Sequence, residues 1–137
     1  MNPRSVAQHC ASLSFFDLQD FAGKNYNKVY NCIESIAEDK ATTILVGTIF
    51  TCIASDRKLS TKEWDFIKQF IGGYSYDEAF KTAEQFYHED AFKTTKEFVE
   101  ALPMDIREAY LSLCIAVLAV DGQFHEEEVD FLNWIIG

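Results

Sequence analysis

The chain has 137 residues and a net charge of −10, from twelve basic and twenty-two acidic side chains. The electrostatic field of this negative charge repels phosphate groups, so nucleic acid and anionic membrane surfaces are disfavoured as partners. Cations and basic protein surfaces remain possible partners. Hydrophobic residues make up 48% of the chain and aromatic residues 15%, which is enough to bury a core without metal or disulfide support. The length fits one domain, which we expect to span residues 1–137.

The cysteines and the apolar stretches predict the compartment. Cys10, Cys32, Cys52 and Cys114 are scattered without C-x-x-C or metal-finger spacing, so free and mostly buried thiols are expected. The N-terminus lacks a basic region followed by an apolar run, which argues against a secretion signal. The longest apolar stretch, residues 109–120, is too short to span a bilayer. We therefore expect a cytoplasmic protein with no membrane insertion.

The first half of the chain predicts helices. Residues 1–8 show no period, and no element is expected there. Apolar residues in 12–21 predict a short helix ended by Gly23, and a spacing of three and four over 26–39 predicts an amphipathic helix. Residues 41–55 are apolar on every side, which is typical of a helix in the centre of a core.

The next elements carry clear start and stop signals. Ser60 and Glu63 form the S-x-x-E pattern of a capping box, which predicts a helix ended by the glycine pair at 72–73. Residues 76–102 predict two surface helices that meet near 88–90. Pro103 suits the start of a further helix, which is apolar all round from residue 109 to 120.

A duplicated segment organises the whole chain. Residues 53–72 and 118–137 align without a gap, and seven of the twenty aligned positions are identical. Each copy predicts the end of an apolar helix, then an acidic turn, then an amphipathic helix. In the second copy this amphipathic helix is expected over residues 125–136. We therefore predict an all-α fold: a compact bundle of seven or eight helices with two internally related helix-turn-helix halves.

Each copy places an aspartate at a helix end and a glutamate seven residues later. These pairs are Asp56 with Glu63 and Asp121 with Glu128. A tight turn can bring the two carboxylates together, and clustered carboxylate oxygens suit Ca²⁺, Mg²⁺ or Mn²⁺. The four residues are the predicted metal ligands, and a divalent cation is the only predicted cofactor.

The second turn is the stronger candidate for this cation. Arg57 and Lys58 follow Asp56, and their charges oppose a bound cation. Residues 104–137 contain seven acidic residues and one basic residue. The alternative is structural, because Glu63 can complete a cap and the glutamates at 126–128 lie in a first turn, where negative charge offsets the helix dipole.

Catalytic patterns are absent from the sequence. It contains no G-x-S-x-G, P-loop, dinucleotide-binding fingerprint or H-E-x-x-H. The adjacent His9 and Cys10 are a poor nucleophile and base pair, because neighbouring residues on a helix do not face each other. The aromatic residues between 74 and 87 fit core and rim positions better than a ligand cage. We expect a protein that is not an enzyme.

The doubled unit resembles the TerB-like family, named for a bacterial tellurite-resistance protein. The family signature is small apolar residues, Asp-Gly, an apolar residue and a glutamate opening the next helix. Residues 119–128 match it, and residues 54–63 match with Arg57 in place of the glycine. The resemblance is strongest over residues 45–137. It implies an all-helical fold with two related halves, and a divalent-metal site at the paired acidic turns.

The resemblance also implies a non-enzymatic role in tellurite or other stress responses, exerted through protein partners. The first functional hypothesis is therefore a cytoplasmic TerB-like module that binds a divalent cation through Asp121 and Glu128, and less strongly through Asp56 and Glu63. The alternative is a purely structural interaction adaptor without metal, in which the acidic turns serve as helix caps.

Overall fold

The computed structural model describes residues 3–37, 41–53, 59–71, 73–85, 89–120, 130 and 132–134. The elements of this part of the chain are all helices, and none of its residues forms a strand. They are α1 (Pro3–Ser12), α2 (Phe15–Ala37), α3 (Ala41–Ile53), α4 (Thr61–Ile67), α5 (Tyr76–Gln85), α6 (Glu89–Ala101) and α7 (Met104–Ala119). Asp130 and residues 132–134 are helical as well. The predicted all-α helical bundle is confirmed.

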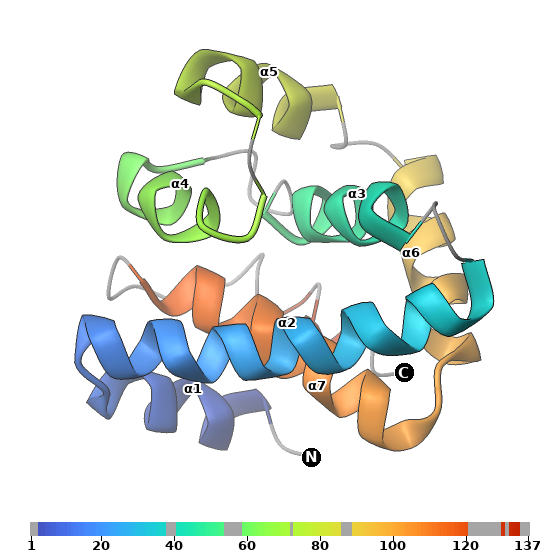
Figure 1. Ribbon diagram of the computed structural model, residues 1–137, viewed down its shortest axis with the longest axis horizontal. Coiled ribbons are helices and arrows are strands. Elements are labelled where there is room, and N and C mark those ends of the chain that lie inside the picture. Colours follow the sequence, from blue (N-terminus) through green and yellow to red (C-terminus); the bar gives the residue numbers. More distant parts are fainter. Residues whose placement is uncertain are drawn as a thin grey trace.

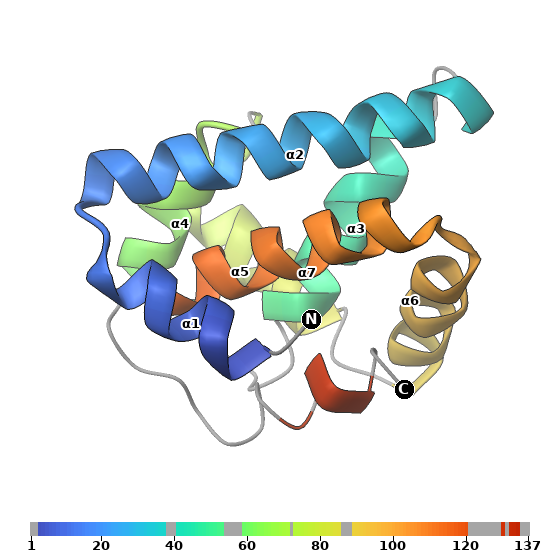
Figure 2. The same cartoon turned by 90° about the horizontal axis from the view of Figure 1, so that it is seen from below.

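The centre of the bundle is α7. Ten of its sixteen residues are buried, because its apolar side chains leave no polar face to turn outward. Figure 2 shows α7 between α2 on one side and α1 and α6 on the other, with α3 crossing behind it. The Tyr110 hydroxyl of α7 donates a hydrogen bond to the Thr48 carbonyl oxygen of α3, at 3.0 Å. The prediction that these two helices occupy the core is confirmed.

The burial of α3 and α7 can be compared by extending the alignment of the duplicated segments, with its offset of 65 residues, back from residues 53 and 118. At this offset both members of six pairs are buried: Leu45 and Tyr110, and then, over residues 48–52, Thr48 and Leu113, Ile49 and Cys114, Phe50 and Ile115, Thr51 and Ala116, Cys52 and Val117. Further on, Ile67 and Leu132 are also both buried. The relation between the two halves stays a prediction, because most of the second copy lies outside the described residues.

Two predictions for the N-terminal region are wrong. The sequence indicates no element over residues 1–8, but α1 begins at Pro3 and packs on α7, with Cys10 buried. Gly23 is expected to end a helix, yet α2 continues through it to Ala37. A Cβ at Gly23 would lie 3.6 Å from Phe70 Cε1, an ordinary contact. Packing of the buried face of α2 on α7 outweighs the weak helix propensity of a single glycine.

The helix boundaries follow local hydrogen bonding. Before α4, the Ser60 side chain accepts from Glu63 N, and the Glu63 side chain accepts from Ser60 N, so the predicted capping box is confirmed. Helix α4 ends at Ile67, four residues earlier than predicted, and Gly73 takes a φ of 91° in the turn beyond it. Pro103 stands at the N-cap of α7, as expected for a proline beside a first turn.

Arg107 fixes the corner between α6 and α7. Its Nε donates to the Val99 carbonyl at 3.1 Å, and its Nη2 donates to the carbonyls of Glu100 at 2.7 Å and Leu102 at 3.4 Å. The Val99 and Glu100 carbonyls belong to the last turn of α6, where carbonyls lack the usual partner one turn further along the helix, and Leu102 follows the helix. The Val99 carbonyl also accepts a hydrogen bond from Leu102 N at 3.1 Å. One side chain of α7 therefore caps the end of α6. Figure 1 shows the corner between these two helices.

The described helices include none that is both long and apolar enough to cross a membrane.

Candidate functional site

The first acidic turn has a structural role at its glutamate. Glu63 Oε1 accepts a hydrogen bond from Ser60 N at 2.9 Å, and Glu63 N donates to Ser60 Oγ at 3.0 Å. The Glu63 side chain is only 5% exposed, and it holds the start of α4. The other predicted ligand of this turn, Asp56, lies outside the described residues. The capping interpretation of Glu63 is confirmed, and its role as a metal ligand stays a prediction.

The second acidic turn is not covered by the structure. Both of its predicted ligands, Asp121 and Glu128, lie outside the described residues, as does most of the predicted helix over 125–136. Asp130 is exposed and Leu132 is buried. Among the side chains that the structure does describe, no group of three or more His, Cys, Asp and Glu could hold a metal ion. The cation site at Asp121 and Glu128 stays a prediction.

The same capping motif occurs again at α5, where the sequence analysis did not identify it. Ser75 N donates to Glu78 Oε1 at 3.2 Å, and Glu78 N donates to Ser75 Oγ at 3.2 Å. The signal was present as S-x-x-E at residues 75–78. Both side chains of this second box are exposed, whereas Glu63 is buried. The S-x-x-E patterns at residues 60–63 and 75–78 therefore both start a helix, although only the first follows a predicted acidic turn, whereas the serine of the same pattern at residues 35–38 lies in the last turn of α2.

The thiols are free, and three of them are buried as predicted: Cys10, Cys52 and Cys114, with Cys32 half-buried. Burial raises the pKa of the Cys10 thiol from 9.0 to about 11. A thiol that keeps its proton is a weak nucleophile. The neighbouring His9 is exposed, and its ring lies edge-on to Phe21 at 5.5 Å between centroids. This pair has the features of packing residues.

A buried polar cluster joins α3 and α7. Tyr110 is fully buried, and burial raises its pKa well above the usual value, with further contributions from Cys114 and Cys52. Its hydroxyl is satisfied by the Thr48 carbonyl at 3.0 Å. The cluster pairs the two central helices and is closed to solvent, so it is structural.

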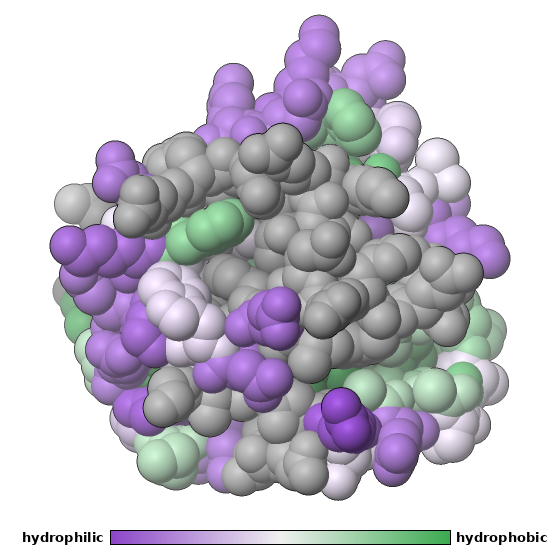
Figure 3. Space-filling model, turned by 180° about the vertical axis from the view of Figure 1, so that it is seen from behind, coloured by the Kyte–Doolittle hydropathy of each residue, from purple (hydrophilic) through white to green (hydrophobic). Residues whose placement is uncertain are grey.

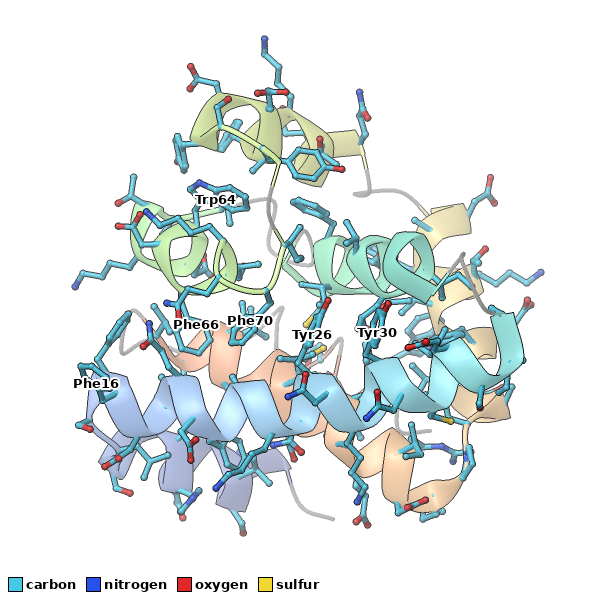
Figure 4. The ribbon with its side chains drawn as sticks, in the orientation of Figure 1. Phe16, Tyr26, Tyr30, Trp64, Phe66 and Phe70 are labelled. Atoms are coloured by element: carbon cyan, nitrogen blue, oxygen red, sulfur yellow. The ribbon has the colours of Figure 1, made fainter. Side chains whose placement is uncertain are left out.

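The most distinctive surface feature is a row of aromatic rings that the sequence analysis missed. The ring centroids of Phe15 and Phe66 are 6.0 Å apart, and those of Phe66 and Phe70 are 5.9 Å apart. The row continues from Phe70 to Tyr26 at 5.4 Å, and from Tyr26 to Tyr30 at 6.1 Å. We call these five residues the aromatic row. Figure 4 labels four of them, Phe66, Phe70, Tyr26 and Tyr30, which lie between α2 on one side and α4 and α3 on the other.

The row runs from the interior to an exposed end. Phe66 is fully buried, whereas Phe15 is 52% exposed and the adjacent Phe16 is 81% exposed. Ser14 Oγ accepts from Asp17 N at 3.1 Å and caps the start of α2, which fixes the backbone that carries both phenylalanines. The result is an exposed apolar pair, Phe15 and Phe16, at the corner between α1 and α2, of which Phe15 packs on the buried Phe66.

Other exposed apolar side chains lie apart from this pair. Ile36 is near the far end of α2, Met104 begins α7, and Phe80 lies on α5. On the face shown in Figure 3, the described residues at the α5 edge are mostly hydrophilic, and hydrophobic ones occupy separate small areas. The aromatic residues predicted as core and rim fit that description where they are described. Tyr76 is half-buried and donates to the Leu59 carbonyl at 2.8 Å.

Comparison of the chain with protein-family models, with curated proteins and with solved structures gave no match. The resemblance to the TerB-like family therefore rests on the duplicated motif in residues 54–63 and 119–128.

Proposed function

We propose that this chain is a non-enzymatic, TerB-like interaction module of the cytoplasm that binds a protein partner through Phe15 and Phe16. The observation that carries the proposal is the exposure of these two adjacent phenylalanines, 52% and 81%. Aromatic side chains are enriched among the residues that contribute most to protein interfaces. Burying Phe16 against a partner would remove a large apolar surface from water.

The base beneath the pair favours binding. Phe15 packs edge-on against Phe66, at an interplanar angle of 75°. The Ser14 cap holds the first turn of α2. A side chain that is already fixed in the free protein loses less conformational freedom on binding, so more of the contact energy appears as affinity. Phe15 is therefore a preorganised anchor for an apolar pocket in the partner, and the cap fixes the backbone that carries Phe16.

The charge of the chain indicates the character of the partner. With a net charge of −10, the domain attracts a basic protein surface and repels an acidic one. Asp17 follows the pair directly, and Asp20 lies four residues after Phe16 on α2, where it pairs with Lys24 at 3.0 Å. We therefore expect the partner to offer an apolar pocket within a basic surface, and we expect association to slow as salt rises.

The acidic turns have separate roles in this proposal. The first is a helix cap, which is supported by the reciprocal hydrogen bonds between Ser60 and Glu63. The second is the candidate site for Ca²⁺, Mg²⁺ or Mn²⁺ through Asp121 and Glu128, a second function favoured by the excess of acidic over basic residues in 104–137. The TerB-like resemblance connects both activities to tellurite or related stress responses.

The test compares two exposed apolar positions. The wild-type chain, Phe16→Ser and Met104→Ser are immobilised, and proteins from an extract of the source cells are captured and identified. Met104 is the matched control, because it is 64% exposed and lies on α7. We expect a protein that the wild type and Met104→Ser retain and Phe16→Ser loses. Equal capture by all three chains would contradict the proposed surface.

A further inference from the structure

Asp17 occupies the position at which the two capping boxes carry a glutamate. It stands three residues after the cap Ser14, as Glu63 and Glu78 stand after their own serines. In both boxes the glutamate accepts a hydrogen bond from the serine N–H, at 2.9 and 3.2 Å. At α2 only half of this arrangement is present, because Asp17 N donates to Ser14 Oγ but the Asp17 carboxylate accepts no hydrogen bond from any described residue. The aspartate side chain is one methylene shorter than that of glutamate, which leaves its carboxylate outside the cap.

The Asp17 carboxylate is also outside the ion pairs of the helices around it. Asp20 pairs with Lys24 at 3.0 Å, and Asp65 pairs with Lys68 at 3.1 Å. None of the ion pairs among the described residues includes Asp17, which is exposed in the first turn of α2. Such a carboxylate can pair with a cation of another molecule without first losing a bond within its own chain. Its charge also offsets the helix dipole, a role that a glutamate would serve equally.

Asp17 borders the exposed pair Phe15 and Phe16. Side chains of a helix lean toward its N-terminus, so those of the first turn surround one end of α2. Figure 4 shows Phe16 at this end of α2, on the outer edge of the molecule. A partner surface that buries Phe16 therefore also covers the carboxylate of the next residue. A charge pair formed there is partly removed from water, so it is screened less than one on the open surface.

We propose that Asp17 is the residue that recognises the basic character of the partner, and that its carboxylate pairs with a lysine or arginine beside the apolar pocket for Phe16. This pairing rests on the proposed function, because it needs a partner at the same corner. The aspartate, unlike the glutamates of the two complete boxes, leaves its charge available to that partner. The pairing orients the partner on the corner and speeds its association.

Variants at positions 17 and 20 test the pairing. The probe is the purified protein that the wild type retains and Phe16→Ser loses, and its dissociation constant is measured for each chain. Asp17→Glu keeps the charge and supplies the longer side chain that completes the boxes of α4 and α5. Asp17→Asn removes the charge. Asp20→Asn is the matched control, because it removes the same charge from the same helix at a residue already paired with Lys24.

The glutamate variant separates binding from helix stability. Asp17→Glu should raise the midpoint of thermal unfolding by about 1–4 °C through the completed box, and should bind the partner about threefold to fivefold more weakly. Asp17→Asn should weaken binding by a similar factor and lessen its dependence on salt. Asp20→Asn should stay within about twofold of the wild-type dissociation constant. A purely structural role of Asp17 would not move stability and affinity in opposite directions in one variant.

Wild-type affinity in either variant at position 17 would overturn the inference and leave the surface at Phe15 and Phe16 intact, since Phe16→Ser still loses the partner. Equal weakening by Asp17→Asn and Asp20→Asn would also overturn it, because net charge alone would then govern binding. If Phe16→Ser retains every protein that the wild type retains, the proposed surface and the role of Asp17 are both wrong.

Discussion

Replacing Glu63 by glutamine and by alanine separates a helix cap from a metal ligand. Glutamine keeps an acceptor oxygen for the hydrogen bond that Ser60 N donates at 2.9 Å, and S-x-x-Q is itself a capping pattern. Alanine removes the acceptor and leaves the N–H at the start of α4 without that partner. Because the Glu63 side chain is only 5% exposed, water can compensate for little of the loss.

The expected magnitudes follow from this geometry. Glu63→Ala should lower the free energy of unfolding by about 1–2 kcal/mol, the usual loss for a cap with a desolvated partner. For a domain of this size the midpoint of thermal unfolding should fall by roughly 3–10 °C. Glu63→Gln should stay within about 0.5 kcal/mol of the wild type. The exposed box at Ser75 and Glu78 is the internal control, and Glu78→Ala should cost less than Glu63→Ala because water can replace its bonds.

The assay is urea and thermal unfolding followed by circular dichroism, with and without a chelator. If Glu63 is a cap, Glu63→Gln should unfold like the wild type under both conditions. If Glu63 is a metal ligand, glutamine and alanine should abolish a cation-dependent stabilisation to the same extent. The assignment of Glu63 as a cap alone would be refuted if both substitutions removed a metal response at this turn.

Three further perturbations follow from the structure. Arg107→Met should lower the free energy of unfolding by about 2–3 kcal/mol in urea titrations, because three carbonyls at the α6 end lose a charged donor. Arg107→Lys should recover only part of this loss. Equal stability of the wild type and both variants would argue against the cap. Burial raises the pKa of the Cys10 thiol from 9.0 to about 11 in the folded chain. The contribution of this protonated thiol to the free energy of unfolding is therefore fully present below pH 9 and is lost as pH rises toward 11. That shift corresponds to at most about 2.7 kcal/mol, and with solvent screening we expect about 1–2 kcal/mol, seen as a steeper fall in wild-type stability than in Cys10→Ala between pH 8 and 10.5. For the second acidic turn, the free energy of unfolding of chelator-treated protein should rise by about 2.7 kcal/mol when a divalent cation is added at one hundred times its dissociation constant. Glu128→Gln should abolish this gain. No response to Ca²⁺, Mg²⁺ or Mn²⁺ would leave this turn without a metal role.

The central helices could be predicted because their sequence leaves one solution. A helix such as α7, apolar on every side from Ala109, has no face to offer water and must lie in the core. The cap at Ser60 was equally local, since both of its hydrogen bonds lie within four residues. Gly23 shows the limit of local reasoning, because tertiary packing along α2 decided the conformation of a residue whose own preference is weak.

The candidate surfaces could not be predicted, because they depend on which helices meet. Tyr26 and Tyr30 are four residues apart in α2, and Phe66 and Phe70 are four residues apart in α4 and the turn that follows it. Each pair was therefore visible in the sequence. Nothing local indicated that the two pairs would join into one row. The hydrogen bond that Lys96 of α6 donates to the Trp134 carbonyl oxygen spans 38 residues and was hidden for the same reason.

Site-specific photocrosslinking tests the proposed interaction surface most directly. A benzophenone-bearing phenylalanine analogue is placed at position 16 in one chain and at position 104 in another, both exposed positions. After irradiation in the source cells, we expect one covalent adduct with a basic protein from position 16 and none with that protein from position 104. The same adduct from position 104, or its absence from position 16 while the partner is still captured, would contradict a partner surface at Phe15 and Phe16.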